Sequence, residues 1–339
     1  MDTRNPDLDP ALKDDTFEYS LRPQRLGEYI GQDKVKARLE IALLAAKKRG
    51  DVLDHVLLFG PPGLGKTTLA HVLANEMNSP CKVIQAPALE KKGDLAAILT
   101  NLEPGEFLFI DEIHRLPAAI EEMLYAAMED RKLDILIGQG PSAQTLKVDL
   151  RPFTLVGATT RAGLISKPLH DRFGMSHRLE YYTQSDLTVI AERSARVLEV
   201  EMAPEGAKAI ARRSRGTPRI CNRLLRRCRD YAQVKGQGAI TAEIADACLT
   251  LHEVDELGLD SLDRAYLEAL CIKFRGGPVG VRTLAAALGE ADGGALEDLV
   301  EPFLMQIGFL DRTQQGRKAT DATYNYLGIK TGQGDLFGN

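Results

Sequence analysis

The sequence predicts a parallel α/β domain, an all-helical unit and a smaller third unit, in that order along 339 residues. Up to residue 182, apolar runs of strand length alternate with helix-length segments, which is typical of a parallel sheet. From residue 183 to residue 255 the periodicity is helical only. The third unit is expected to hold helices at 261–274, 282–288 and 295–307 and a possible hairpin over 309–323. We therefore expect domains at 1–182, 183–255 and 256–339.

The first domain is expected to carry helices on both faces of its sheet, because short glycine turns join each strand to the next helix. Phe107–Ile110 is apolar throughout, as is typical of a strand buried on both faces. Alternating residues around Gly138-Gln139-Gly140-Pro141 predict a β-hairpin over 133–150. The other elements expected here are helices at 33–50, 67–77, 94–101 and 118–129 and strands at 55–59, 81–85, 106–112 and 153–160.

The composition is that of a globular cytoplasmic protein. Hydrophobic residues make up 44% and charged residues 27% of the chain, and no apolar run reaches the length of a membrane span. Residues 1–16 are acidic and polar, which predicts a loose leader rather than a signal peptide. The five cysteines never form C-x-x-C, so reduced thiols in a cytosol are expected. The six histidines form no metal-binding motif, and a net charge of −5 allows only local contacts with DNA.

A phosphate-binding motif lies between a predicted strand and a predicted helix, in the stretch Gly60-Pro61-Pro62-Gly63-Leu64-Gly65-Lys66-Thr67-Thr68. It matches G-x-x-x-x-G-K-[ST] in the context that this motif requires. The glycine-rich turn leaves backbone N–H groups free to contact phosphate oxygens, and the helix N-terminus adds partial positive charge. Lys66 is expected to contact the β- and γ-phosphates, and the Thr67 hydroxyl to hold Mg²⁺. The stretch therefore predicts a nucleoside triphosphate site.

Two carboxylates follow the apolar strand that ends at Ile110. Asp111 is expected to support Mg²⁺ opposite Thr67, and Glu112 to polarise a water molecule. A kinase, which passes phosphate to a substrate hydroxyl, would not need a glutamate there. The pair therefore favours an ATPase, with an ordinary solvated strand end as the alternative.

Further polar residues follow in the chain. Thr159 and Thr160 end the next strand, where a hydroxyl could position water or contact the γ-phosphate, or only favour β-structure. His114 is expected to make local hydrogen bonds rather than to act in catalysis. Arg172 lies in a loop and could stabilise transition-state charge, a role that a neighbouring molecule often supplies. Arg219 opens a helix and could couple the nucleotide to the angle between domains.

A strongly basic run surrounds Arg219. Its members are Arg212, Arg213, Arg215, Arg219, Arg223, Arg226, Arg227 and Arg229. We interpret this run as a helix face that forms salt bridges with its neighbours, in preference to a DNA contact.

Six segments together carry a family likeness: Gly60–Thr68, Leu108–Leu116, Gly157–Gly163, Leu169–Gly174, Gly216–Arg227 and Gly276–Gly280. They resemble the RuvB family, the AAA+ ATPase motors of bacterial Holliday-junction branch migration, over about residues 16–329. The resemblance implies an AAA+ ATPase domain, a helical lid and a C-terminal winged-helix domain. It also implies a homohexameric ring on duplex DNA, with ATP at each subunit interface, acting in recombination and repair.

The resemblance assigns site residues motif by motif. It implies that Glu112 activates water, that Asp111 supports the metal and that Thr159 falls at sensor 1. Arg172 is similar to the arginine finger that acts on the neighbour's ATP, and Arg219 to sensor 2. The residues implied to bind ATP or its Mg²⁺ are Leu21, Arg22, Gly63, Gly65, Lys66, Thr67, Thr68, Glu129, Asp130, Arg131, Tyr182 and Arg219.

The resemblance also implies partners for two surfaces. The hairpin at 133–150 would grip RuvA, in an assembly that includes RuvC, through apolar residues 133–137 if it protrudes. A hairpin packed on its own sheet is the alternative. Arg312 and Arg317 of the wing would contact the DNA backbone whatever its sequence. The helix at 295–307 is expected to bury Leu296, Leu299, Val300, Phe303, Leu304 and Ile307, and to expose Glu297, Asp298 and Glu301, which would repel phosphate.

Two departures from the family pattern concern DNA and catalysis. His170 stands where a second arginine is usual. Gln314-Gln315 stands where proline-arginine is usual, and this second departure predicts weaker autonomous DNA binding.

Two other functions fit part of the sequence. An ATP-dependent switch, such as an origin initiator or clamp loader, would hydrolyse ATP slowly and only change shape. A P-loop kinase is disfavoured by Glu112.

Overall fold

The structure, a computed structural model, describes residues 20–137, 144–291 and 293–329. The chain forms two compact units. The first contains the residues up to Glu199 together with Gly216–Asn222, and the second contains Val200–Arg215 and the residues from Arg223 onward. Within the described segments, every helix is too short or too polar to cross a bilayer.

Five described strands form a parallel sheet in the first unit. Phe59 pairs with Thr159, and Gln85 with Asp111, so these strands end at one edge of the sheet. Ligand sites of parallel sheets lie at this carboxyl edge. The predicted strands are confirmed, but β7 is an addition, because its sequence, Met-Ser-His-Arg, contains no apolar run. The strand order is β2 (Cys81–Gln85), β3 (Phe107–Asp111), β6 (Thr154–Thr159), β1 (Val56–Phe59) and β7 (Met175–Arg178).

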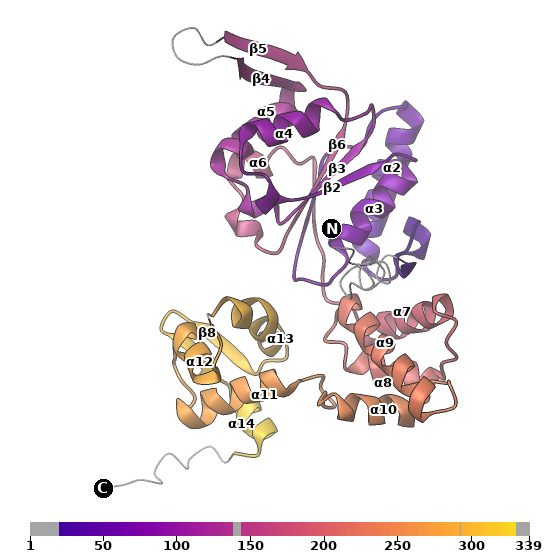
Figure 1. Cartoon of the computed structure of the whole chain (residues 1–339), viewed down its shortest axis with the longest axis vertical. Coiled ribbons are helices and arrows are strands. Elements are labelled where there is room, and N and C mark those ends of the chain that lie inside the picture. Colours follow the sequence, from indigo (N-terminus) through magenta and orange to yellow (C-terminus); the bar gives the residue numbers. More distant parts are fainter. Residues whose placement is uncertain (1–19, 138–143, 292, 330–339) are drawn as a thin grey trace, which may run out of the picture. The chain divides into compact units, whose positions relative to one another are not determined.

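Helices cover both faces of the sheet, as predicted (Figure 1). On one side lie α2 (Asp33–Arg49) and α3 (Lys66–Glu76), and on the other α4 (Lys92–Thr100) and α5 (Ala118–Asp130). The one-turn helix α6 (Lys167–His170) precedes β7, and α7 (Gln184–Val197) follows it.

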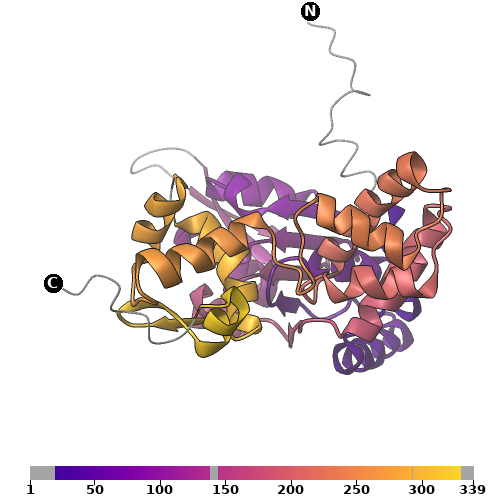
Figure 2. The ribbon, with the colours of Figure 1, turned by 90° about the horizontal axis from the view of Figure 1, so that it is seen from below.

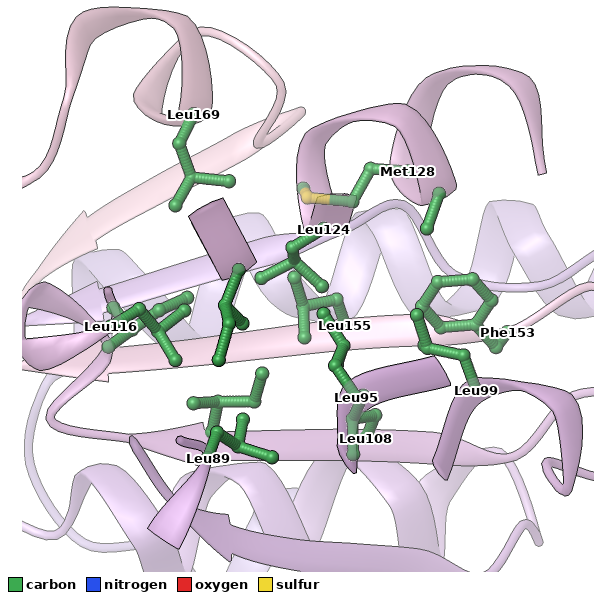
Figure 3. Packing of buried hydrophobic residues seen from close by; sticks show 14 of the residues in the cluster. Leu89, Leu95, Leu99, Leu108, Leu116, Leu124, Met128, Phe153, Leu155 and Leu169 are labelled. Carbon is green, nitrogen blue, oxygen red and sulfur yellow. The ribbon is translucent and has the colours of Figure 1, made fainter. Parts of the chain in front are cut away.

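The core between the sheet and helices α4 and α5 holds the strands in place (Figure 3). Leu108 of β3 and Leu155 of β6 pack in one cluster with Leu95 of α4 and Leu124 of α5, and all four side chains are fully buried. Each such leucine contributes about 1.5–3 kcal/mol of burial free energy. A close-packed core leaves little positional freedom to the residues that follow each strand, which is where the polar side chains lie.

The predicted hairpin is present as β4 (Lys132–Ile137) and β5 (Gln144–Asp149), which pair antiparallel in a sheet of their own. Figure 1 shows it at the end of α5, beyond the central sheet. Leu133, predicted to be exposed, is buried, whereas Leu146 is 49% exposed. The predicted turn at 138–141 and the side chains of 135–137 lie outside the described residues.

Helices dominate residues 183–255, as predicted. They are α7, α8 (Pro204–Arg212), α9 (Pro218–Lys235) and α10 (Ala242–Leu251), with an isolated β-bridge between Met202 and Ile240. Arg213 and Arg215 of the basic run form salt bridges, but they lie at the end of α8 and just before α9 rather than on the helix face that the sequence predicts. Arg213 contacts Asp246 at 2.6 Å, and Arg215 contacts Asp263 at 2.5 Å. Both arginine side chains are buried and stabilise the second unit.

The C-terminal part of the second unit gathers the helices and strands of a winged-helix domain into one body (Figure 2). Strands β8 and β9 pair antiparallel as the wing. The hairpin predicted over 309–323 is too long, because Asp321, an acid favoured in a first helical turn, begins α14. The elements are α11 (Ser261–Glu268), a π turn (Ala269–Lys273), α12 (Val281–Leu288), a second π turn (Leu296–Val300), α13 (Glu301–Gln306), β8 (Leu310–Thr313), β9 (Gly316–Ala319) and α14 (Asp321–Leu327).

Two residues of the segment predicted as one helix at 295–307 lie on the opposite side from the prediction. Leu299, expected in the core, is 68% exposed, whereas Glu301, expected at the surface, is fully buried. The π turn over Leu296–Val300 shifts the helical phase, so a spacing of 3.6 residues does not hold across it. The carboxylate of Glu301 therefore belongs to the interior of the domain.

Candidate nucleotide site

A cleft of about 620 Å³ opens at the carboxyl edge of the central sheet, within the first unit. The phosphate loop and the start of α3 form one wall, and the ends of β3 and β6 contribute polar groups to it. Most of the predicted ATP and metal residues meet here. The predicted residues that line the cleft are Leu21, Arg22, Gly63, Gly65, Lys66, Thr67, Thr68, Asp111, Glu112, Tyr182 and Arg219.

Two glycines of the phosphate loop are required by its geometry. Gly60 and Gly65 have φ angles of +143° and +90°, a region that side chains rarely adopt. A Cβ atom on Gly60 would lie 2.5 Å from the Leu179 carbonyl oxygen, and one on Gly65 would lie 2.9 Å from the Tyr29 hydroxyl. Without glycine the loop could not close over β1 and present its N–H groups at the start of α3.

Lys66 lies at the base of the loop with its charge toward the acidic strand end. Its Nζ donates hydrogen bonds to the carbonyl oxygens of Gly60 at 2.8 Å and Pro61 at 2.9 Å. Burial lowers the pKa of Lys66, and the nearby carboxylates of Glu112 and Asp111 oppose this shift. A buried cation of this kind is suited to bind a polyanion such as a triphosphate.

The oxygen donors at this edge fit Mg²⁺. The Thr67 hydroxyl and the Asp111 carboxylate both line the cleft, and oxygen ligands are those that Mg²⁺ prefers. Among the residues that the structure describes, no group of three or more His, Cys, Asp or Glu side chains could hold a metal alone. A site with two protein oxygens suits an ion that takes its other ligands from phosphate and water.

Two tyrosines, Tyr29 and Tyr182, contact the phosphate loop and support it. The Tyr182 hydroxyl donates to the Tyr29 hydroxyl at 3.1 Å, and both lie 3.3 Å from the Leu64 carbonyl oxygen. Burial raises the pKa of Tyr182 to about 12 and that of Tyr29 well above its usual value, so both stay neutral. Arg193 Nη1 donates to the Leu21 carbonyl oxygen at 2.7 Å, which fixes the backbone of that predicted lining residue.

Several lining residues escaped the sequence analysis. They come from segments far apart in the chain, and none stands in a motif that would mark it. The one sequence signal that could have marked any of them as a site residue is a polar side chain at the end of a strand, and only Gln85 has it. These residues are Tyr29, His71, Gln85, Arg193 and Asn222.

Thr160, rather than Thr159, faces the cleft. Thr159 is fully buried and does not line it, whereas Thr160 does. Thr159 is the last residue of β6, and Thr160 follows the strand with its side chain at the cleft. Of the predicted threonine pair, the structure therefore places Thr160 at the cleft and the Thr159 hydroxyl beside His114. The Thr160 hydroxyl donates to Glu112 Oε2 at 3.1 Å.

Arg172 lies outside the cleft of its own chain, in a cluster with residues of α5. Its Nη2 contacts Glu129 Oε2 at 2.8 Å and donates to the Tyr125 hydroxyl at 2.6 Å. The guanidinium carbon also lies 4.6 Å from the centre of the Tyr125 ring. Glu129, Asp130 and Arg131 are exposed at the end of α5 and are likewise outside the cleft. The structure thus groups Arg172 with Glu129 rather than with Lys66.

The two predicted DNA contacts differ in exposure. Arg317 is 9% exposed, and its guanidinium contacts Glu301 at 2.8 Å and Glu297 at 2.5 Å. To contact DNA phosphate, as predicted, Arg317 would have to leave both carboxylates. Arg312 is 53% exposed and contacts Glu297 at 2.9 Å, so of the two arginines it is the better placed to contact DNA phosphate.

Sequence comparison with protein families matches three consecutive regions of the chain. The Holliday junction DNA helicase RuvB P-loop domain matches residues 21–179. The RuvB AAA lid domain matches residues 182–255, and the RuvB C-terminal winged helix domain matches residues 256–328.

Solved structures of Thermotoga maritima RuvB are similar to the chain. The structure described as the Holliday junction branch migration motor is 48% identical, with a TM-score of 0.84, over 92% of this chain and 99% of that one. A threonine-to-valine variant and an arginine-to-alanine variant of the same protein have the same identity and coverage, each with a TM-score of 0.83. The chain therefore belongs to the RuvB family of Holliday junction DNA helicases.

Proposed function

We propose that the chain hydrolyses ATP to drive branch migration of Holliday junctions, as a homohexameric ring that works with RuvA. One observation carries the proposal. The phosphate loop, Asp111 and Glu112 meet in one cleft at the sheet edge, in a chain of the RuvB family. This combination supports a motor that hydrolyses ATP rather than a protein that only binds it.

The cleft offers the groups that transfer of a phosphoryl group to water needs. Loop N–H groups and Lys66 bind and orient the β- and γ-phosphates. Thr67 and Asp111 would hold Mg²⁺, which neutralises charge on the phosphate oxygens when it is bound. Glu112 accepts a proton from the attacking water, and its contact with Thr160 aims its carboxylate across the cleft.

Arg172 completes the site of the neighbouring subunit. Its position outside its own cleft, beside exposed Glu129 and Asp130, supports this role. In a cyclic ring each subunit presents the same surface to the next, so one arginine per subunit serves one nucleotide per interface. The guanidinium then stabilises charge on the transferred phosphoryl group.

The hairpin β4–β5 is the surface proposed for RuvA. It forms a sheet of its own beyond the central sheet, and Leu146 exposes apolar surface on it. Exposed apolar side chains on a projecting element suit protein docking.

The test is ATP-dependent dissociation of a synthetic four-way junction, with and without RuvA, beside a Glu112→Gln variant. Movement that needs the partner and disappears in the variant is the expected result. ATP turnover without junction movement would overturn the proposal in favour of an ATP-dependent switch. A four-way junction with unrelated arm sequences controls for sequence preference, which a motor of this kind should lack.

A further inference from the structure

Buried Thr159 is linked to the proposed catalytic glutamate through His114. The Thr159 hydroxyl lies 2.9 Å from His114 Nδ1, and the same nitrogen lies 3.1 Å from Glu112 Oε2. The His114 side chain is only 10% exposed. Three residues from two strand ends therefore form one chain of polar contacts that ends at the cleft.

The chemistry of these groups sets the direction of the bonds. An ionised carboxylate can only accept a hydrogen bond, so the proton of His114 lies on Nδ1 and is donated toward Glu112. The Thr159 oxygen accepts from the Arg161 backbone N–H at 2.9 Å, which fixes the hydroxyl beside the ring. The Nδ1–H of His114 is then shared, because Glu112 Oε2 and the Thr159 oxygen both accept from it, so Thr159 holds the ring through the same hydrogen that orients the carboxylate.

The backbone around these residues is tied to the phosphate loop. The Thr159 carbonyl oxygen accepts from the Gly60 N–H at 3.2 Å, at the first residue of the loop. Glu112 has a φ angle of +50°, a left-handed conformation that is unfavourable for a glutamate. Strain of this kind persists where the surroundings determine the geometry, often at functional sites. Here it turns the side chain back toward β6 and into reach of His114.

We propose that His114 is a positioning residue that orients Glu112, with Thr159 as its anchor. His114 and Thr160 both donate to Oε2, at 3.1 Å each, whereas the contact of Thr160 with Oε1 is 3.5 Å. Oε1 is therefore the less engaged oxygen and is the one that polarises water. The inference rests on the proposed role of Glu112 and assigns a task to Thr159 other than contact with nucleotide.

The test compares His114→Leu with His114→Asn, whose amide can place an N–H near the position of Nδ1. His114→Leu is expected to lower kcat for ATP about 10- to 100-fold, because a misplaced general base is inefficient. The dissociation constant for ATP should stay within about twofold, because Lys66 and the loop are unchanged. His114→Asn should recover part of the lost rate. Exposed His252, replaced by leucine, is the matched control.

A double-mutant cycle separates positioning from general damage. Thr159→Val should lower kcat in the same direction, and adding it to His114→Leu should have less than an additive effect. An unchanged kcat in His114→Leu would overturn the inference, as would parallel losses of ATP affinity and thermal stability without recovery by asparagine. Failure of the proposed function is distinguishable, because Glu112→Gln would then retain turnover whatever the His114 variants do.

Discussion

Lys66 illustrates how one residue combines local and tertiary constraints. The loop brings it to the edge of the sheet, where its Nζ contacts two loop carbonyls and faces two carboxylates. Its ammonium group is thus held in the cleft with much of its hydration replaced by protein groups. A triphosphate would meet a cation already in position, which lowers the cost of binding.

Replacing Lys66 with alanine is expected to abolish ATP binding. Hydrogen bonds to charged groups are worth about 1.5–3 kcal/mol each, so the affinity should fall by about 100-fold or more. Titration with a fluorescent ATP analogue measures the loss. Lys34→Ala, on the exposed side of α2, is the control. Binding of ATP at wild-type affinity by the Lys66 variant would refute the assignment of the loop.

Tyr125 is expected to matter for Arg172 although it lies outside the cleft. Its hydroxyl is the main cause of the raised pKa of Arg172, with Glu129 adding to it, and its ring faces the guanidinium. Tyr125→Phe removes only the hydroxyl and should lower kcat by about tenfold or more, the value of one hydrogen bond to a charged group. Tyr125→Ala also removes the ring and should cost more, at unchanged ATP affinity. Equal rates in all three proteins would show that Tyr125 does not position Arg172.

At the scale of elements, the wing and the helical segment before it share one network of charges. Glu301 of α13 accepts from Arg317 of β9 and, at 3.0 Å, from the Tyr266 hydroxyl of α11. Glu297 contacts both Arg317 and Arg312. Glu301 and Arg317, at the inner end of this network, are buried, whereas Arg312, at its outer end, is exposed. The two wing arginines should therefore respond differently to substitution.

Arg317→Ala is expected to destabilise the second unit by about 3–5 kcal/mol, because it leaves the carboxylate of Glu301 buried without its cationic partner. Urea unfolding followed by circular dichroism measures the change. The double variant Arg317→Met with Glu301→Leu should recover most of the stability, because it removes both charges. If the single variant unfolds like the wild type, Arg317 is not a structural residue and its role as a DNA contact gains weight.

Arg312→Ala should leave stability nearly unchanged and weaken DNA binding for all sequences alike. Each lost phosphate contact reduces the slope of log K against log salt by about 0.9. Binding isotherms at several salt concentrations, on two unrelated duplexes, measure this slope. A loss confined to one duplex would indicate base recognition instead.

At the scale of the whole molecule, the cleft and Arg172 are separate parts of one chain. Arg172 and Glu129 contact each other, while Lys66 and Glu112 line the cleft. If each chain supplies an arginine to the next, the active site is complete only in the assembly. Activity should then depend on protein concentration and on which subunits are neighbours.

Mixing two inactive variants tests this dependence. Arg172→Ala should bind ATP but not hydrolyse it, because its transition-state cation is missing. Glu112→Gln subunits retain the arginine and should partly restore turnover when mixed with Arg172→Ala subunits, since a mixed interface contains both groups. Size-exclusion chromatography confirms that mixed assemblies form. An absence of rescue in such assemblies would argue that Arg172 acts within its own chain.

The sequence by itself determined strands β1, β2, β3 and β6 of the central sheet, the phosphate loop and the two carboxylates at the end of β3, but not strand β7. These features depend on contiguous residues, where apolar runs and glycine turns act locally. The prediction of a hairpin at 133–150 also followed from local alternation, although its sequence did not indicate that Leu133 would be buried.

Tertiary structure alone decided which polar side chains meet. It selected Thr160 over Thr159 for the cleft, joined Tyr29 to Tyr182, and buried Glu301 with Arg317. The π turn before α13 altered the helical phase, and no periodicity in the sequence marks that turn. Such pairings depend on the packing of segments that lie far apart in the chain, and local patterns carry no information about distances across that packing.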